Sequence, residues 1–562
     1  MQFINKWPYS LLLLFGLMIA FTACDNDDEP EAVLSVTGIN PTTAPVNGTV
    51  TITGTQFNST PASNTVTFTG NAVANILSAS STQLVVTVPN GAQTGPITVA
   101  TGGQSAVSSQ SFSLGNRAVV EKTGNITANE TWTAGNIYLL RGFVYVKSGA
   151  TITIEPGTII KGAGAAQDPS GQQKGGTLII EAGARINAAG TASAPIVFTS
   201  NQPVGQRKYG DWGGIVIIGR APHNRPGGTG FEGGISGTMG TGTDANDNSG
   251  VLQYVRIEFA GIALTAGNEI NGLTMYGVGA GTTMDHIQVS YGGDDAFEWF
   301  GGTVNAKYLV SYRNFDDDFD TDWGFTGKVQ YGVILRDPNV ADQSGSNAFE
   351  SDNFNNGTPA TGPNNGLPLT APVFANISVF GTSGTPSNTP TSGGSGSYQS
   401  AMHLRRNTSI SIFNSVFLGY PEGLRLDAPA DATGNSTYSN VTGGTLQLRG
   451  VVLGNTNTPV RGAGTITNDQ ATAFFNTTAF KNQIIPAANV SSLLLNSQSF
   501  NLEGSPNFLP QSGSPLLTGS ATIWDGKGAD AFFTKETFLG AFGTTNWTTG
   551  WTNFNPQTTP YN

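Results

Sequence analysis

From residue 117 onward, short apolar runs alternate with polar positions, and glycine-rich turns separate the runs. Residues 150–160 and 176–184 read as strand, glycine turn, strand. No stretch between such runs has room for a crossover helix, so parallel strands can form only if the chain winds into a coil. We therefore predict a parallel β-helix with a C-terminal cap over residues 117–562.

The middle of the predicted coil repeats itself. Residues 289–291 recur as 310–312, and residues 294–298 recur as 316–320, at distances of 21 and 22 residues. A third copy covers residues 347–350. A period of about 20–30 residues is typical of a solenoid in which each repeat forms one rung.

One strand of each rung carries an apolar residue at a fixed position. These residues are Leu273, Phe297, Phe319, Phe349, Met402 and Leu424. Because successive side chains of a strand point to opposite faces, the apolar residues should stack inside the coil and the next residues should point outward. We call this outward series the ladder: Thr274, Glu298, Asp320, Glu350, His403 and Arg425.

Residues 33–114 have a different pattern, with short alternating strands at the spacing of a β-sandwich. Two examples are residues 49–53 and 84–88, with Gly, Pro and Asn turns between the strands. The composition agrees with an all-β protein, since 75 glycines and only 11% charged residues suit short strands and tight turns. The net charge of −12 and pI near 4.7 argue against nucleic acid as a partner, since the sequence has no basic stripe to contact phosphates.

The N-terminus reads as an export signal. Lys6 precedes an apolar run over residues 11–21, which is too short to span a bilayer, and small residues then lead to Cys24. Residues 21–24 resemble the lipobox of bacterial lipoproteins, which implies a signal peptide over 1–23 and lipidation of Cys24. The alternative is an ordinary signal peptide with a chance cysteine. Residues 24–32 form an acidic linker, which in Bacteroidetes-type lipoproteins resembles a signal for display on the outer face of the outer membrane.

The ladder carries the candidate chemistry. Adjacent rungs lie about 4.8 Å apart, so Glu298, Asp320 and Glu350 should form a row that binds a cation or shares protons. Together with His403 and Arg425 they are the candidate catalytic residues. Further oxygen ligands for a hard cation such as Ca²⁺ are Asp294, Asp295, Asp316, Asp317, Asp318 and Asp322. The simpler alternatives are a solvated polar face, turn aspartates that cap backbone groups, or a purely structural cation.

Aromatic residues beside the carboxylates predict a sugar-binding groove. The expected ligand-binding residues are Trp299, Trp323 and Phe325, because flat rings next to carboxylates suit sugar faces. Long inserts at about 355–371 and 382–397 should overhang this groove.

Several longer sequence segments resemble two known families. Residues 39–41, 48–57 and 95–99 resemble an IPT/TIG immunoglobulin-like domain. Residues 210–214 and 248–261, together with the repeat at 294–302, resemble surface lipoproteins of Bacteroidetes-type bacteria. Those proteins join an IPT/TIG domain to a right-handed, pectin-lyase-like β-helix. The resemblance implies an outer-membrane lipoprotein that faces the cell exterior, with the IPT/TIG domain as its stalk.

Two functions remain open. The first is binding of an extracellular glycan or another ligand along the ladder. The second is a polysaccharide lyase or glycoside hydrolase acting on acidic polysaccharide. In a lyase, Ca²⁺ would neutralise a uronate and Lys328 or Arg425 is the candidate base; in a hydrolase, carboxylates of neighbouring rungs about 5 Å apart would suit a retaining mechanism. The Gly-His-Gly and Arg-Ile-Lys motifs of polygalacturonases are absent, which favours binding.

Overall fold

The computed structural model describes residues 33–225, 227–265, 268–353, 366–391, 396–428 and 435–562. The predicted signal peptide, the acidic linker and the lipidation site Cys24 lie outside these residues, so they stay predictions. Within the described ranges, no helix combines the length and the apolar character needed to cross a membrane.

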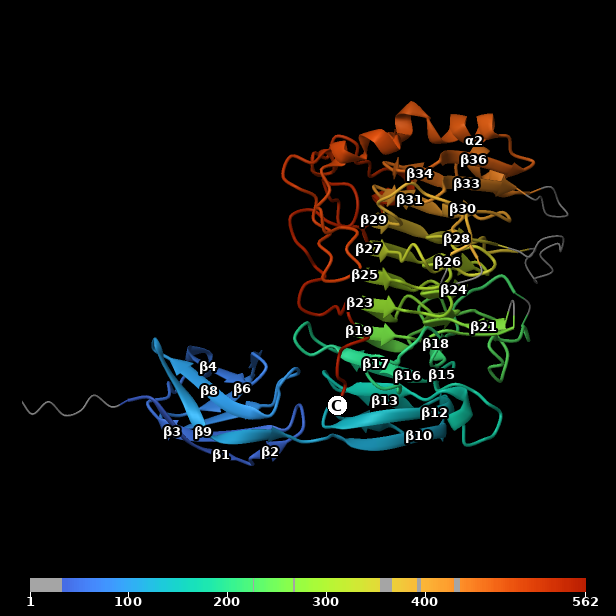
Figure 1. Ribbon diagram of the computed structural model, residues 1–562. Helices are drawn as coiled ribbons and strands as arrows, with labels where there is room; N and C mark the ends of the chain where they lie inside the picture. Colours follow the sequence, from blue (N-terminus) through green and yellow to red (C-terminus); the bar gives the residue numbers. More distant parts are fainter. Residues whose placement is uncertain (1–32, 226, 266–267, 354–365, 392–395, 429–434) are drawn as a thin grey trace, which may run out of the picture.

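The N-terminal domain is a sandwich of two β-sheets, as predicted (Figure 1). Alternation fixes which side chains enter its core: in β3, Val50 and Ile52 are fully buried while the threonines between and around them are not. One sheet has the order β1-β3-β7-β6 and the other β2-β9-β8-β4-β5. The strands are β1 (Ser35–Asn40), β2 (Thr43–Ala44), β3 (Thr49–Thr55), β4 (Asn64–Phe68), β5 (Ala72–Val73), β6 (Ile76–Ala79), β7 (Gln83–Thr87), β8 (Gly95–Thr101) and β9 (Gln104–Leu114).

The second domain is a parallel β-helix, which confirms the predicted fold class (Figure 1). Its 26 strands form one continuous sheet in which each strand pairs in parallel with the corresponding strand of the next rung. Its first part contains β10 (Ala118–Ile126), β11 (Glu130–Trp132), β12 (Asn136–Val146), β13 (Thr151–Ile154), β14 (Ile159–Gly162), β15 (Thr177–Ile180), β16 (Arg185–Ala189), β17 (Ile196–Ser200), β18 (Gly214–Ile218), β19 (Gly250–Glu258), β22 (Leu273–Tyr276), β23 (Thr283–Ser290) and β24 (Phe297–Phe300). Its second part contains β25 (Asn305–Tyr312), β26 (Phe319–Asp322), β27 (Lys328–Leu335), β28 (Phe349–Ser351), β29 (Val373–Phe380), β30 (Ser400–Leu404), β31 (Ser411–Phe413), β32 (Val416–Leu418), β33 (Glu422–Ala428), β34 (Gln447–Arg449), β35 (Val452–Gly454), β36 (Thr458–Gly464) and β37 (Gln483–Ile485).

Short helices and one hairpin lie outside this sheet. The hairpin, β20 (Ile262–Thr265) with β21 (Asn268–Ile270), is inserted between β19 and β22. The helices are α1 (Thr437–Thr442), α2 (Asn468–Phe475), η1 (Pro61–Ser63), η2 (Ala165–Gln167), η3 (Thr478–Phe480), η4 (Ala487–Leu493), η5 (Pro515–Leu517) and η6 (Gly526–Ala529).

Stacked apolar side chains fill the coil. The six residues predicted to stack inside are paired in register from rung to rung, and each is at most 1% exposed. Burial of this column, at about 25 cal/mol per Å² of apolar surface, stabilises each rung against its neighbours. The pattern of one inward apolar residue per rung therefore sets the direction of the ladder residue that follows it.

Different segments cover the far end of the coil and its side. The far end of the coil is covered by α2, whose Phe474 and Phe475 join the interior core. The residues after β37 do not cap this end but run back along the side of the coil toward the N-terminal domain (Figure 1). They are held there by side chains of the coil wall: Gln288 bonds the backbone of Asn553 at 2.8 Å in both directions.

Candidate functional site

The ladder residues lie on adjacent strands in the predicted order. In the sheet register each ladder residue pairs with the next one. The series runs from Thr274 on β22 through Glu298 on β24, Asp320 on β26, Glu350 on β28 and His403 on β30 to Arg425 on β33. Each follows an inward apolar residue, so each points to the outside of the coil wall. The ladder face is nevertheless largely covered, because Glu298 is only 8% exposed and His403 only 5%.

A long insert covers one part of this face. It runs between β18 and β19, and its Ile235 and Met239 pack against Tyr276 and Phe300 on the outside of the wall. The same insert places Arg225 over the ring of Trp323, 5.0 Å from its centroid. The apolar residues Tyr276 and Phe300 at outward positions of their strands were the sequence signal that another segment covers this face.

The predicted exposed aromatic residues are therefore wrong. Trp299 is 1% exposed and Phe325 is fully buried, and their rings stack on each other inside the coil at 5.3 Å. The reason for Trp299 is alternation: Phe297 points inward, so the residue two positions later does too. Trp323 does lie on the outer side, but the insert leaves it 7% exposed. None of these three rings offers an open face to a sugar.

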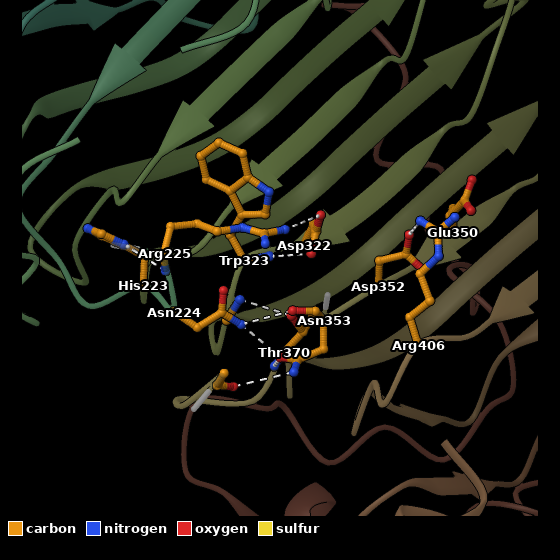
Figure 2. A network of polar contacts seen from close by, with 12 residues as sticks. His223, Asn224, Arg225, Asp322, Trp323, Glu350, Asp352, Asn353, Thr370 and Arg406 are labelled. Carbon is orange, nitrogen blue, oxygen red and sulfur yellow. Dashed lines mark hydrogen bonds and ion pairs between the residues drawn. The ribbon is translucent and has the colours of Figure 1, made fainter. Parts of the chain in front are cut away.

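Polar contacts tie the insert to the wall (Figure 2). Asn224 donates from Nδ2 to Asn353 Oδ1 at 2.9 Å, and the same oxygen accepts from the Thr370 backbone at 2.7 Å. Residues 366–371 of the predicted insert at 355–371 thus join the cover. Residues 354–365 and 392–395 of the two predicted overhanging inserts lie outside the described part of the chain.

Five carboxylates form the centre of the ladder face. We call Asp294, Asp295, Glu298, Asp316 and Asp320 the acidic cluster. They form two groups of three that share Asp295, and within each group the closest oxygens all lie within 4.8 Å of one another. Two come from the turn before β24, one from the turn before β26, and two from the strands themselves. The repeat of the sequence therefore brings acidic residues of consecutive rungs together.

The carboxylates of the acidic cluster have few hydrogen-bond donors and no cationic side chains as partners among the described residues. Asp295 accepts the backbone N–H of Asp317 at 2.9 Å, and Glu298 accepts from Nδ2 of Asn271. Buried oxygens of Asp316 and Asp320 have no hydrogen-bond donor among the described residues. No Lys, Arg or His of the described chain forms an ion pair with any of the five carboxylates.

Burial and like charge shift the protonation of the cluster. Burial, followed by the charges of Asp342 and Glu350, raises the pKa of Asp316 to about 8. The pKa values of Asp294, Asp295, Glu298 and Asp320 also lie well above their usual range, first through burial and then through neighbouring carboxylates. Glu232 of the insert adds to the negative field, and burial together with Glu269 raises its pKa to about 7.

The other three predicted metal ligands already have partners. Asp318 is wrong as a surface ligand: it is fully buried in the coil wall and pairs with the equally buried Arg336 at 3.2 Å. Asp317 accepts the backbone and side-chain N–H groups of Asn347. Asp322 accepts the backbone N–H of Trp323 at 2.6 Å and lies 3.5 Å from Arg225.

The far half of the ladder is neutralised by arginines. Arg405 pairs with Glu350 and with Asp352, and Arg406 pairs with Asp352 at 2.5 Å (Figure 2). Burial alone would raise the pKa of Glu350, but Arg405, with help from His403, lowers it. The basic pair Arg405-Arg406, which follows His403 after one leucine, was the available sequence signal for these contacts. The ladder thus divides into an uncompensated acidic half and a charge-balanced half.

His403 ends the acidic row with both ring nitrogens unbonded. Neither nitrogen has a hydrogen-bond partner among the described residues. Nδ1 lies 3.8 Å from Glu350, and Nε2 lies 3.7 Å from Asp427. Arg425 continues the ladder 3.9 Å from Glu422. Lys328 does not belong to the site, because it pairs with Asp530 of the C-terminal segment at 2.8 Å.

Comparisons with known proteins identify both domains. Residues 124–492 match the family described as "Pectate-lyase like beta helix domain", and residues 34–114 match the IPT/TIG domain. No curated protein sequence matches the chain.

Among solved structures, an auxiliary nutrient binding protein from Bacteroides thetaiotaomicron is 18% identical over 16% of this chain and 22% of its own, with a TM-score of 0.15. One from Bacteroides ovatus is 21% identical over 16% and 22%, with a TM-score of 0.15. This chain therefore spans less than a quarter of their length. The Dettilon tailspike protein is 11% identical over 66% and 62%, with a TM-score of 0.21. These likenesses are too distant to bear on function. Since the first family covers well over half of the residues, the chain belongs to the pectate-lyase-like β-helix family and carries an IPT/TIG domain before the coil.

Proposed function

We propose that this protein is an outer-membrane lipoprotein of the cell surface whose coil binds an extracellular glycan at the ladder face. In this proposal Cys24 carries the lipid anchor, the IPT/TIG domain is the stalk, and the acidic cluster holds Ca²⁺ that coordinates the oxygens of the glycan. Ca²⁺ prefers six to eight oxygen ligands, of which carboxylates are the commonest charged kind. Sugar hydroxyls or uronates would complete the coordination.

One observation carries the proposal. The acidic cluster presents converging carboxylates from consecutive rungs, and no cationic side chain of the described residues pairs with them. Arginines neutralise neighbouring carboxylates at Asp322, Glu350 and Asp352, so the uncompensated half is a distinct feature of the wall. Buried like charges are costly unless a cation or protons neutralise them. A hard divalent cation supplies this charge from solution.

A ladder variant tests where the glycan binds. Changing Glu298, Asp320 and Glu350 to their amides keeps the side-chain shape while removing charge, so calcium-dependent glycan binding should fall about tenfold or more. A glycan array with residues 33–562, followed by titration of any hit, measures the effect. The matched control is Asp469→Asn, an exposed acidic residue on α2 far from the ladder. Deleting residues 33–114 should leave this calcium-dependent affinity nearly unchanged. If the deletion abolishes binding while the triple amide variant binds normally, the glycan site is not on the ladder.

A second candidate function, a retaining glycoside hydrolase, has one observation in its favour. Oxygens of Glu298 and Asp320 lie within 4.8 Å of each other, which is near the separation of about 5 Å that retaining enzymes use. The raised pKa values of both groups would keep one protonated as a general acid. Analysis of products from any bound glycan distinguishes cleavage from binding alone.

The anchoring step is tested at Cys24. Replacing Cys24 with Ser removes the thiol that a lipoprotein transferase would modify, so the protein should leave the membrane fraction or accumulate as an unprocessed precursor. Membrane fractionation and mass measurement of the mature N-terminus give the answer. An unchanged membrane fraction for Cys24→Ser would contradict lipid anchoring.

A further inference from the structure

A pocket of about 800 Å³ lies where the N-terminal domain, the first rungs of the coil and the end of the C-terminal segment meet. Figure 1 shows the C-terminus next to this junction. The N-terminal domain contributes residues 90–94, the coil contributes Arg117, Ile159 and Arg256, and the C-terminal segment contributes Asn553 and Tyr561. The three parts of the chain are therefore all needed to form it.

The lining of this pocket carries positive charge and no acidic side chain. Its charged side chains are Arg117 and Arg256, and no Asp or Glu lines it. In a chain with a net charge of −12, a pocket lined by two arginines and by no Asp or Glu side chain is a marked local exception, with the terminal carboxylate of Asn562 as the one anionic group among its lining residues. Lys161 and Arg207 add to the positive field, because they lie close enough to interact electrostatically and the pKa of Lys161 is lowered, first by burial and then by Arg207 and Arg117.

Arg117 is buried without an anionic partner. It is 4% exposed, and its guanidinium reaches only neutral oxygens: Gly157 O at 3.4 Å and Asn90 Oδ1 at 3.5 Å. Its Nε has no acceptor, and no described carboxylate pairs with it. Burial lowers the pKa of Arg117 to about 10, so the side chain is still charged at neutral pH. A buried charge without a partner is costly, which is why such groups usually meet a counter-ion.

Arg256 has similarly weak contacts. Its Nη1 and Nη2 reach Trp551 O at 3.4 Å and the Tyr561 hydroxyl at 3.5 Å, near the limit of a hydrogen bond. Its nearest carboxylate is Glu258, 3.5 Å from Nε. Glu258 is fully buried, accepts the Tyr561 hydroxyl at 2.6 Å, and has its pKa raised by burial. It therefore compensates Arg256 only in part.

We propose that this interdomain pocket binds an acidic saccharide, with the carboxylate of a hexuronate residue held between Arg117 and Arg256. The planar guanidinium fork matches a carboxylate, and arginine is the usual choice for such recognition. Amide side chains of Asn90, Gln93 and Asn116 on the lining suit sugar hydroxyls. The volume lies in the range of small-molecule sites, which occur preferentially at domain junctions. This site is separate from the acidic cluster and needs no calcium.

Calorimetric titration of residues 33–562 with trigalacturonate in the presence of EDTA tests the proposal. We expect binding that Arg117→Gln and Arg256→Gln each weaken about tenfold or more, while the fully methyl-esterified trisaccharide does not bind. Arg141→Gln, a change of the same kind at a partly exposed residue of β12, should bind like the unchanged protein. Unchanged affinity in both pocket variants, or equal affinity for the ester, overturns the proposal. Inorganic sulfate or phosphate that binds as tightly as the trisaccharide would refute the saccharide assignment.

The thermal stability of Arg117→Met without ligand separates a binding role from a structural one. If the role of Arg117 is to bind an anionic ligand, removing its unpaired buried charge should leave the melting temperature of the ligand-free protein unchanged or raise it. Trigalacturonate should then stabilise the unchanged protein and not Arg117→Met. A melting temperature that falls in Arg117→Met, with no trigalacturonate effect on either protein, would show that Arg117 only joins the two domains. These results do not depend on Glu298, Asp320 or Glu350, so this proposal and the ladder proposal can fail separately.

Discussion

Calcium should stabilise this protein against unfolding, and Asp295→Asn should remove most of the effect. Asp295 belongs to both groups of three carboxylates, so its charge matters to any cation in the acidic cluster. A ligand that binds only the folded state adds RT ln(1 + [L]/Kd) to the free energy of unfolding. At a Ca²⁺ concentration 100 times Kd this is about 2.7 kcal/mol. Melting curves with Ca²⁺ and with EDTA measure the difference.

Two controls sharpen the calcium experiment. Asp469→Asn removes one exposed charge at the far end of the coil and should keep the full calcium effect. Mg²⁺ at equal concentration should stabilise less, because it demands a smaller and more regular octahedron than the spread of these carboxylates offers. Identical melting curves in Ca²⁺ and EDTA would remove the acidic cluster as a metal site.

Without metal, the stability of the protein should fall as the pH rises from about 4 to about 8. In the folded state the pKa of Asp316 is raised from 3.8 to about 8 and that of Glu232 from 4.5 to about 7. Between the unfolded and folded pKa values the folded chain holds protons that the unfolded chain has released. The stabilisation from each of these two groups is therefore fully present below its pKa in the unfolded chain, and it is lost as the pH rises through its pKa in the folded protein. Each retained proton contributes a slope of about 1.4 kcal/mol per pH unit.

Denaturant unfolding in EDTA at several pH values between 4 and 8 measures this slope. Ca²⁺ should flatten it, because a bound cation replaces the protons on the cluster. Glu350 has the opposite effect on the pH dependence of stability, because its pKa is lowered in the folded protein. Its contribution changes only below pH 4.5, the pKa of this group in the unfolded chain. A flat profile in EDTA, or a rise of stability with pH across this window, would contradict the raised pKa values.

Local pattern was sufficient to predict the fold and the order of the ladder. The alternation of inward and outward residues is a property of every strand, and the repeat spacing aligns one strand with the next. Phe297, Phe319 and Phe349 therefore identified the inner column, and the residue after each identified the ladder. The same alternation already contained the correct position of Trp299, two residues after an inward phenylalanine.

What covers the wall, and which charges are compensated, was decided only by the tertiary structure. The insert that buries Trp323 comes from a segment whose approach to the ladder leaves no periodic trace in the sequence. The arginines that neutralise Glu350 and Asp352 directly follow β30, but only the structure shows with which carboxylates they pair. The C-terminal segment likewise returns along the coil through single side-chain contacts such as that between Tyr561 and Glu258, 303 residues apart. Regular strand pairing follows from local sequence because each rung repeats its neighbour, whereas the course of an irregular segment depends on contacts with residues far away in the chain.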